Sequence, residues 1–188
     1  MLGLAKTRLI PAIGAHPAAV LQERLTERTI QTVISADIGP VTLWCAPDVT
    51  HPSFAALSRL NGITLRTQPA GDLGARMLAA MQSGPTLVIG TDCPAFTPTH
   101  LQDAARALQT HDVVLVPAED GGYVLIGTNA PHPGLFDGMV WSTPRVAAET
   151  RVRAAKLNLS LHELAPLWDV DTEGDLARME REFPELRL

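Results

Sequence analysis

The chain contains little cysteine, few aromatic residues and no excess of positive charge. Its 188 residues include 2 cysteines, 3 tryptophans, 1 tyrosine and 4 phenylalanines. Cys45 and Cys93 have neither metal-site nor redox-pair spacing, which favours two partly buried thiols in a reducing cytosol. The formal net charge of −5 argues against a broad nucleic-acid-binding face.

Long apolar runs are also missing. No apolar stretch reaches the roughly 18 residues of a membrane-spanning helix, and residues 1–6 lack the basic-then-apolar order of a secretory signal. We find no internal repeat, low-complexity tract or linker. With 46% hydrophobic and 19% charged residues, the composition is typical of a soluble globular protein. We therefore expect one cytoplasmic domain over residues 1–188, large enough for a single core.

Apolar runs rich in β-branched residues alternate with helical patterns along the chain. The runs predict strands over residues 41–45, 63–68, 86–90, 113–117 and 123–127. Helical periodicity predicts helices over residues 17–36, 73–81, 98–108, 144–155 and 173–183. The Thr-Pro pairs at 97–98 and 143–144 look like helix caps followed by proline in the first turn. The alternation predicts an α/β fold, a mostly parallel central sheet with helices on both faces.

An aspartate stands just after the apolar strand predicted at 86–90. Ligands of open α/β sheets bind outside the carboxyl ends of the strands. Asp92 is therefore well placed to hold Mg²⁺ or Mn²⁺ carrying a phosphate, and Pro94 stiffens the turn that follows. Capping of a turn or helix by Asp92 is the alternative, with about equal weight from this segment alone.

A second acidic segment lies near the carboxyl end of the chain. Alternation places Asp169 and Asp171 on one side of an extended segment. Two carboxylates on one side repel each other unless a cation lies near them. Asp171 and Thr172 also precede a predicted helix, so either is a candidate N-cap, and capping does not exclude metal binding.

Two glycine-containing segments are candidates for binding a phosphate or a nucleobase. Gly3 lets backbone approach a phosphate, and Lys6 and Arg8 supply cations for it, although a frayed basic terminus is the favoured interpretation of this segment on its own. Gln68 can both donate to and accept from a nucleobase edge, and Gly71 follows it in a turn. A plain turn with Asp72 as a helix N-cap is the alternative here.

The last such segment is Asp120-Gly121-Gly122-Tyr123. Adjacent glycines allow backbone conformations that other residues avoid, and the Tyr123 hydroxyl can orient a substrate. On their own, the same four residues are better explained as a hairpin turn between the strands at 113–117 and 123–127.

Taken in order, these motifs resemble a bacterial family of glycosyltransferase-like proteins with the nucleotide-diphospho-sugar transferase fold of the GT-A type. That family is distantly similar to molybdopterin and phospholactate guanylyltransferases. The resemblance extends from Gly3 to about Leu176 and depends on six short motifs, which are KTRL at 6–9, Q..GDLG.RM at 68–77, GTDCP at 90–94, DGGY at 120–123 with Gly127, WST at 141–143 and DVDT..DL at 169–176.

The resemblance implies a site for a nucleotide, a divalent cation and an acceptor. It assigns Mg²⁺ or Mn²⁺ to Asp92 and Asp171, with Asp169 as a further candidate. It gives catalytic roles to Lys6, Arg8 and Asp92. Nucleotide contacts fall on Gly3, Lys6, Arg8, Gln68 and Gly71. The acceptor side falls on Asp120, Gly121, Gly122, Tyr123 and Trp141.

The activity implied is transfer from a nucleotide-activated donor to a small-molecule acceptor. In glycosyl transfer, our first expectation, an acceptor hydroxyl attacks the sugar and a nucleoside diphosphate leaves. In nucleotidyl transfer, an acceptor phosphate attacks a nucleoside triphosphate and pyrophosphate leaves. One set of acidic and basic groups serves either reaction, because both depend on positioning and charge stabilisation. A catalytically silent nucleotide-binding protein is the third possibility, and the base, sugar and acceptor stay open.

The resemblance also concerns the beginning of the sequence. Family members have a first β-strand and a Lys-x-Pro segment before the glycine loop, whereas Met1 here falls within that loop. We therefore expect a first strand to be missing from the middle of the sheet. The natural gene is expected to begin upstream of Met1, or else the protein is truncated.

Overall fold

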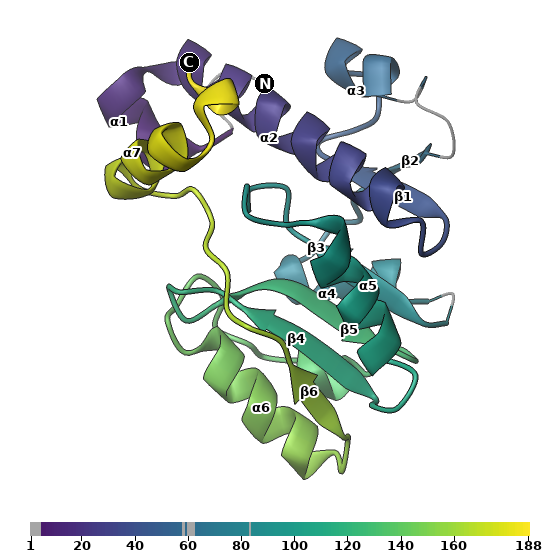
Figure 1. The fold of residues 1–188 in the computed structure, drawn as a ribbon. Coiled ribbons are helices and arrows are strands. Elements are labelled where there is room, and N and C mark those ends of the chain that lie inside the picture. The colour runs from purple at the N-terminus through teal and green to yellow at the C-terminus, as the bar shows by residue number, and fades with distance from the viewer. Residues whose placement is uncertain (1–4, 58, 60–62, 83) are drawn as a thin grey trace.

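Helices and strands alternate along the chain in a computed structural model that describes residues 5–57, 59, 63–82 and 84–188 (Figure 1). The strands are β1 (Val41–Cys45), β2 (Ile63–Thr67), β3 (Thr86–Ile89), β4 (Val113–Pro117), β5 (Tyr123–Thr128) and β6 (Leu161–Glu163). The α-helices are α1 (Ile10–Ile13), α2 (Ala15–Ala36), α3 (Pro52–Leu57), α4 (Leu73–Ala80), α5 (Pro98–Ala107), α6 (Val146–Lys156) and α7 (Glu173–Glu182). Three short 3₁₀ helices are η1 (Thr7–Leu9), η2 (Pro133–Leu135) and η3 (Pro184–Leu186).

The predicted α/β class is confirmed, but the strands form two sheets. One sheet has the order β3-β5-β4-β6, in which β5 is antiparallel to both β3 and β4 while β6 is parallel to β4. The other is the parallel pair β1-β2. Among the described residues no ladder joins β1 to β3, and residues 5–40 form helices and turns.

The larger sheet is buried on both faces, as the sequence predicts. Successive residues of β4 point to opposite sides. Val114 and Val116 join the core cluster that contains α5, whereas Val113 and Leu115 join the cluster that contains α4 and α6. All four side chains are fully buried, and each contributes about 1.5–3 kcal/mol of hydrophobic stabilisation. The sheet is therefore a rigid support for the turns at its edge.

A third core cluster joins the two ends of the described chain. Leu9, Leu21 and Leu25 pack with Met179 and Leu186, so that α1 and α2 lie beside α7 (Figure 1). The cluster also includes side chains of the extended segment that links β6 to α7. This packing brings the basic residues before α1 next to the acidic residues before α7.

No helix in residues 5–57, 59, 63–82 and 84–188 is long and apolar enough to cross a membrane.

Candidate functional site

The first part of the site is the turn after β3, which carries Asp92. The Asp92 carbonyl oxygen accepts a hydrogen bond from the Val170 amide at 3.0 Å, which ties this turn to the segment between β6 and α7. The Gln22 side chain of α2 donates to the Thr91 hydroxyl at 3.0 Å. A Cβ at position 90 would lie 2.7 Å from the Asp92 Oδ1 atom. The absence of a side chain at Gly90 therefore lets the Asp92 carboxylate fold back over this position.

The second part is the extended segment that follows β6. Its Leu164 and Leu167 amides donate to carbonyls of β4, so the segment continues alongside that strand. Trp168 and Val170 are buried in the core, and alternation turns Asp169 and Asp171 to the other side, as the sequence predicts.

Capping of α7 does not use the Asp171 carboxylate. The Thr172 hydroxyl accepts from the Asp175 amide, and the Asp175 carboxylate accepts from the Asp171 and Thr172 amides at 3.2 and 2.8 Å. The N-cap is therefore Thr172, and the Asp171 carboxylate remains directed at the site.

Three carboxylates meet where these two segments lie side by side. Asp92, Asp169 and Asp171 each offer an oxygen, and the three oxygens lie within 4.8 Å of one another. Oxygens bound to one Mg²⁺ or Ca²⁺ lie roughly 2.0–2.6 Å from the ion, so this spacing fits a shared divalent cation. Burial, reinforced by neighbouring carboxylates, raises the pKa of Asp169 to about 6. Carboxylate oxygens are hard donors of the kind that the expected Mg²⁺ or Mn²⁺ prefers.

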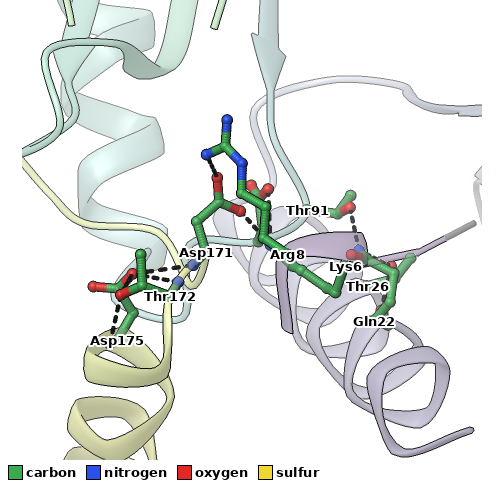
Figure 2. A network of polar contacts seen from close by, with 9 residues as sticks. Lys6, Arg8, Gln22, Thr26, Thr91, Asp171, Thr172 and Asp175 are labelled. Carbon is green, nitrogen blue, oxygen red and sulfur yellow. Dashed lines mark hydrogen bonds and ion pairs between the residues drawn. The ribbon is translucent and has the colours of Figure 1, made fainter. Parts of the chain in front are cut away.

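Lys6 and Arg8 of the N-terminal segment face two of these carboxylates, and Figure 2 shows both basic residues beside Asp171. The Lys6 Nζ atom lies 3.1 Å from Asp92 Oδ2 and 3.3 Å from Asp171 Oδ1. The Arg8 Nη1 atom lies 2.9 Å from Asp171 Oδ2. Together with Thr7 and Gln22, these four residues line an open pocket of about 210 Å³. The structure therefore unites the predicted catalytic residues, while Gly3 lies outside the described residues.

Asp120 adjoins the acidic group from the β4–β5 hairpin. Its charge is one of the causes that raise the pKa of Asp169. The hairpin turn is closed by a hydrogen bond of 2.8 Å from the Gly122 amide to Asp120 Oδ1. Gly121 has a φ of +91°, and a Cβ there would lie 2.1 Å from the Pro144 carbonyl oxygen, so the turn packs tightly against the loop before α6. The turn is therefore the predicted hairpin turn, and it brings the Asp120 charge close to Asp169.

The Tyr123 hydroxyl is not among the groups brought to the site. It donates to the Met77 sulfur at 3.9 Å, and the side chain packs against the core cluster between the sheet, α4 and α6. Burial raises the pKa of Tyr123. An acceptor contact through this hydroxyl requires the side chain to leave its core position.

The remaining predicted residues form a separate polar group, at the start of α4. The Gln68 amide donates to the Trp44 carbonyl at 3.1 Å and accepts from Arg76 Nη1 at 3.2 Å. Arg76 Nε also donates to the Gly71 carbonyl at 3.2 Å. Both ends of the Gln68 amide are thus engaged within the protein, and reading a base requires at least one of these bonds to be exchanged.

Trp141 and Asp72 complete this second group. Asp72 is the N-cap of α4, accepting from the Ala75 amide at 2.9 Å, as one of the sequence interpretations predicts. Its second oxygen accepts from the Trp141 indole at 3.2 Å, and Trp141 stacks on Phe136. Trp141 is therefore held by the start of α4.

The fold and the site together define a protein with the nucleotide-diphospho-sugar transferase fold. A solved structure from Desulfovibrio desulfuricans G20, named "putative nucleotide-diphospho-sugar transferase", matches with a TM-score of 0.86 and 28% identity over 97% of this chain and 82% of that chain. CMP:2-keto-3-deoxy-manno-octonic acid synthetase complexed with CTP matches with a TM-score of 0.57 and 11% identity, over 86% and 88% of the two chains. The second likeness shows the fold alone.

The family is shown by the sequence comparison. The chain belongs to the family described as "Uncharacterized protein conserved in bacteria (DUF2064)", which matches residues 29–143. No match is found among curated proteins. The predicted resemblance to nucleotide-diphospho-sugar transferases is confirmed. The family match includes Asp92 and Asp120, whereas Lys6, Arg8 and Asp171 lie outside it.

Proposed function

We propose that this chain is a metal-dependent transferase that uses a nucleotide-activated donor, and that it transfers a glycosyl group from a nucleotide-sugar. The observation that carries the proposal is the meeting of three carboxylates with Lys6 and Arg8 at the edge of the sheet. The likeness to the Desulfovibrio protein, over nearly the whole chain, supports the nucleotide-sugar as donor.

Each charged group has a role in this proposal. Asp92 and Asp171, with Asp169, hold Mg²⁺ or Mn²⁺, which when bound neutralises charge on the departing diphosphate. Arg8 is largely exposed at the mouth of the pocket, with its guanidinium 2.9 Å from Asp171 Oδ2, and binds phosphate oxygens by charge-assisted hydrogen bonds. Asp120, on the hairpin beside the acidic group, accepts a hydrogen bond from the attacking hydroxyl of the acceptor.

A thermal-shift screen tests donor binding. Nucleoside triphosphates and nucleotide-sugars are each added with Mn²⁺, because a ligand present at about 100 times its Kd stabilises the fold by about 2.7 kcal/mol. At roughly 2–4 °C per kcal/mol for a domain of this size, the expected rise in Tm is about 5–10 °C. Asp112→Ala is the matched control, since Asp112 lies just before β4, at the opposite end of that strand from the Asp120 hairpin, and its removal should leave the shift unchanged.

The products then decide the reaction. Release of a nucleoside diphosphate from the stabilising nucleotide-sugar, on addition of acceptor hydroxyls, supports glycosyl transfer. Release of pyrophosphate from a triphosphate instead selects nucleotidyl transfer. Failure of every nucleotide to raise the Tm, with Mg²⁺ as with Mn²⁺, contradicts the proposal and favours a protein without this activity.

A further inference from the structure

The Lys6 ammonium lies where a shared cation would bind. Its Nζ atom contacts one oxygen of Asp92 and one of Asp171 at 3.1 and 3.3 Å, and its side chain is only 4% exposed. These two carboxylates belong to the group of three whose oxygens lie within 4.8 Å of one another. The lysine thus bridges the ligands expected for the metal.

A divalent cation and the ammonium cannot both occupy this position. Each needs the facing oxygens of Asp92 and Asp171, and two cations a few ångströms apart repel strongly in a partly buried site. We propose that Lys6 is an internal counter-ion, which occupies the acidic site, weakens its binding of a free divalent cation, and leaves most readily when the cation arrives with a nucleotide phosphate. This inference rests on the proposed function and adds to it an order of binding.

The chemistry of lysine allows this exchange. The ammonium is a compact charge on a flexible four-carbon chain, so it can move without a change in the backbone. Lys6 also lines the pocket with Thr7 and Arg8, and phosphate oxygens bound there offer it new partners. A cation arriving alone must break two ion pairs without replacement. A cation arriving with phosphate releases an ammonium that pairs again, so cation and phosphate strengthen each other's binding reciprocally.

Arg8 provides a matched comparison within the same site. It carries the same charge but makes one ion pair, to Asp171, and its side chain is 60% exposed. Removing Arg8 changes the net charge near the carboxylates as much as removing Lys6 does. Only the removal of Lys6 empties the position between the two carboxylates.

Titration of Mn²⁺ into metal-free protein, without nucleotide, tests the inference. Lys6→Met should bind Mn²⁺ at least about tenfold more tightly than the wild type, whereas Arg8→Met should gain at most about threefold. Addition of inorganic pyrophosphate should tighten Mn²⁺ binding in the wild type and much less in Lys6→Met. An equal gain in the two variants, or no gain in Lys6→Met, would overturn the counter-ion role.

The same titration separates this inference from the proposed function. If wild-type protein binds Mn²⁺ with pyrophosphate but Lys6→Met binds Mn²⁺ alone no more tightly, only the counter-ion role is wrong. If neither protein binds Mn²⁺ under any of these conditions, the metal-dependent function fails and takes the counter-ion role with it.

Chemical labelling of lysine gives a readout that needs no variant. The sequence contains two lysines, Lys6 and Lys156, and Lys156 is exposed on α6. In metal-free protein an amine-acylating reagent should modify Lys6 much more slowly than Lys156. Saturation with Mn²⁺ alone should raise the Lys6 rate and leave the Lys156 rate unchanged. Unchanged protection of Lys6 in the Mn²⁺-bound protein would contradict the displacement.

Discussion

Two aspartates of this chain, Asp72 and Asp169, have opposite electrostatic surroundings. Asp72 caps α4, and its hydrogen bonds, first from the Ala75 amide and then from the Trp141 indole, hold its pKa below the ordinary value. Asp169 is partly buried among other carboxylates, and its pKa is raised to about 6. In the first position the protein stabilises the charge, whereas in the second the charge destabilises the protein.

The difference indicates that the polar group around Asp72 stabilises the fold, whereas the group around Asp169 is suited to bind a ligand. Around Asp72, the polar atoms of Gln68 and Arg76 are satisfied by the protein itself. Around Asp169, three carboxylates are held together by a backbone hydrogen bond, a buried core and the ion pairs of Lys6 and Arg8 with the other two, despite the repulsion that raises the pKa of Asp169. A carboxylate with a strongly perturbed pKa and specific charged neighbours is a candidate for function, because a bound ligand can offset the destabilisation that its charge causes.

The largest effect is expected from Asp92→Ala. Loss of this ligand should weaken binding of Mn²⁺ with nucleotide by more than about 100-fold and abolish the rise in Tm. The metal-free fold should persist, because removal of one carboxylate also relieves repulsion on Asp169. Calorimetric titration and a melting curve measure the two effects. A variant that binds Mn²⁺ and nucleotide as well as the wild type would retire the metal assignment.

The next largest effect concerns the contribution of the Asp169 charge to the stability of the folded protein. Its folded-state pKa of about 6 exceeds the ordinary value of roughly 3.9, so the ionised form is disfavoured in the folded state. This penalty is absent below the ordinary pKa, grows between the two values and is complete above about pH 6. Asp169→Asn should therefore stabilise the metal-free protein at pH 8 by on the order of 1–2 kcal/mol, allowing for solvent screening.

Denaturant unfolding of the wild type and of Asp169→Asn at pH 4, 6 and 8 measures this dependence. The advantage of the asparagine variant should be largest at pH 8 and nearly vanish at pH 4. A constant advantage at every pH would show that packing, rather than charge repulsion, distinguishes the two proteins. Saturating Mn²⁺ should reverse the order at pH 8, since the aspartate then has a cation to bind.

Local signals predict some element ends and miss others. Thr97 caps α5 as predicted, and its hydroxyl accepts from the His100 amide. Thr143 does not cap α6, because its hydroxyl donates to the Val140 carbonyl and the helix begins only at Val146. The three-residue strand β6 is too short to show alternation and was not predicted. Its position is set by pairing with β4, a contact between distant parts of the chain.

The sequence predicts which residue types form the candidate site, but it does not predict which of them contact one another. A strand-end aspartate and an alternating acidic pair can be recognised from the sequence, and the family resemblance places the basic residues with them. The ion pair of Lys6 with Asp92 joins residues 86 positions apart, and packing of α1 and α2 against α7 makes it possible. Gln22 was not foreseen, although a glutamine within an amphipathic helix is a weak signal for a polar contact.

The smallest effect is expected at Asp72, where the same substitutions should act in the opposite direction. Asp72→Ala removes the cap of α4 and the contact with Trp141, and should lower the Tm by about 2–4 °C without changing Mn²⁺ binding. Asp72→Asn keeps the capping geometry, because the asparagine side-chain oxygen accepts a hydrogen bond from the Ala75 amide equally well, and should lower the Tm less.

Because the folded-state pKa of Asp72 is lowered, the stability from its charge is present above the ordinary pKa and is lost as the pH falls through the folded value. The difference between wild type and Asp72→Asn should therefore shrink at low pH, where Asp72 is protonated. Melting curves of both variants beside Asp169→Asn measure the comparison, and a stabilising Asp72→Asn would show that the two aspartates do not differ in the way their neighbours indicate.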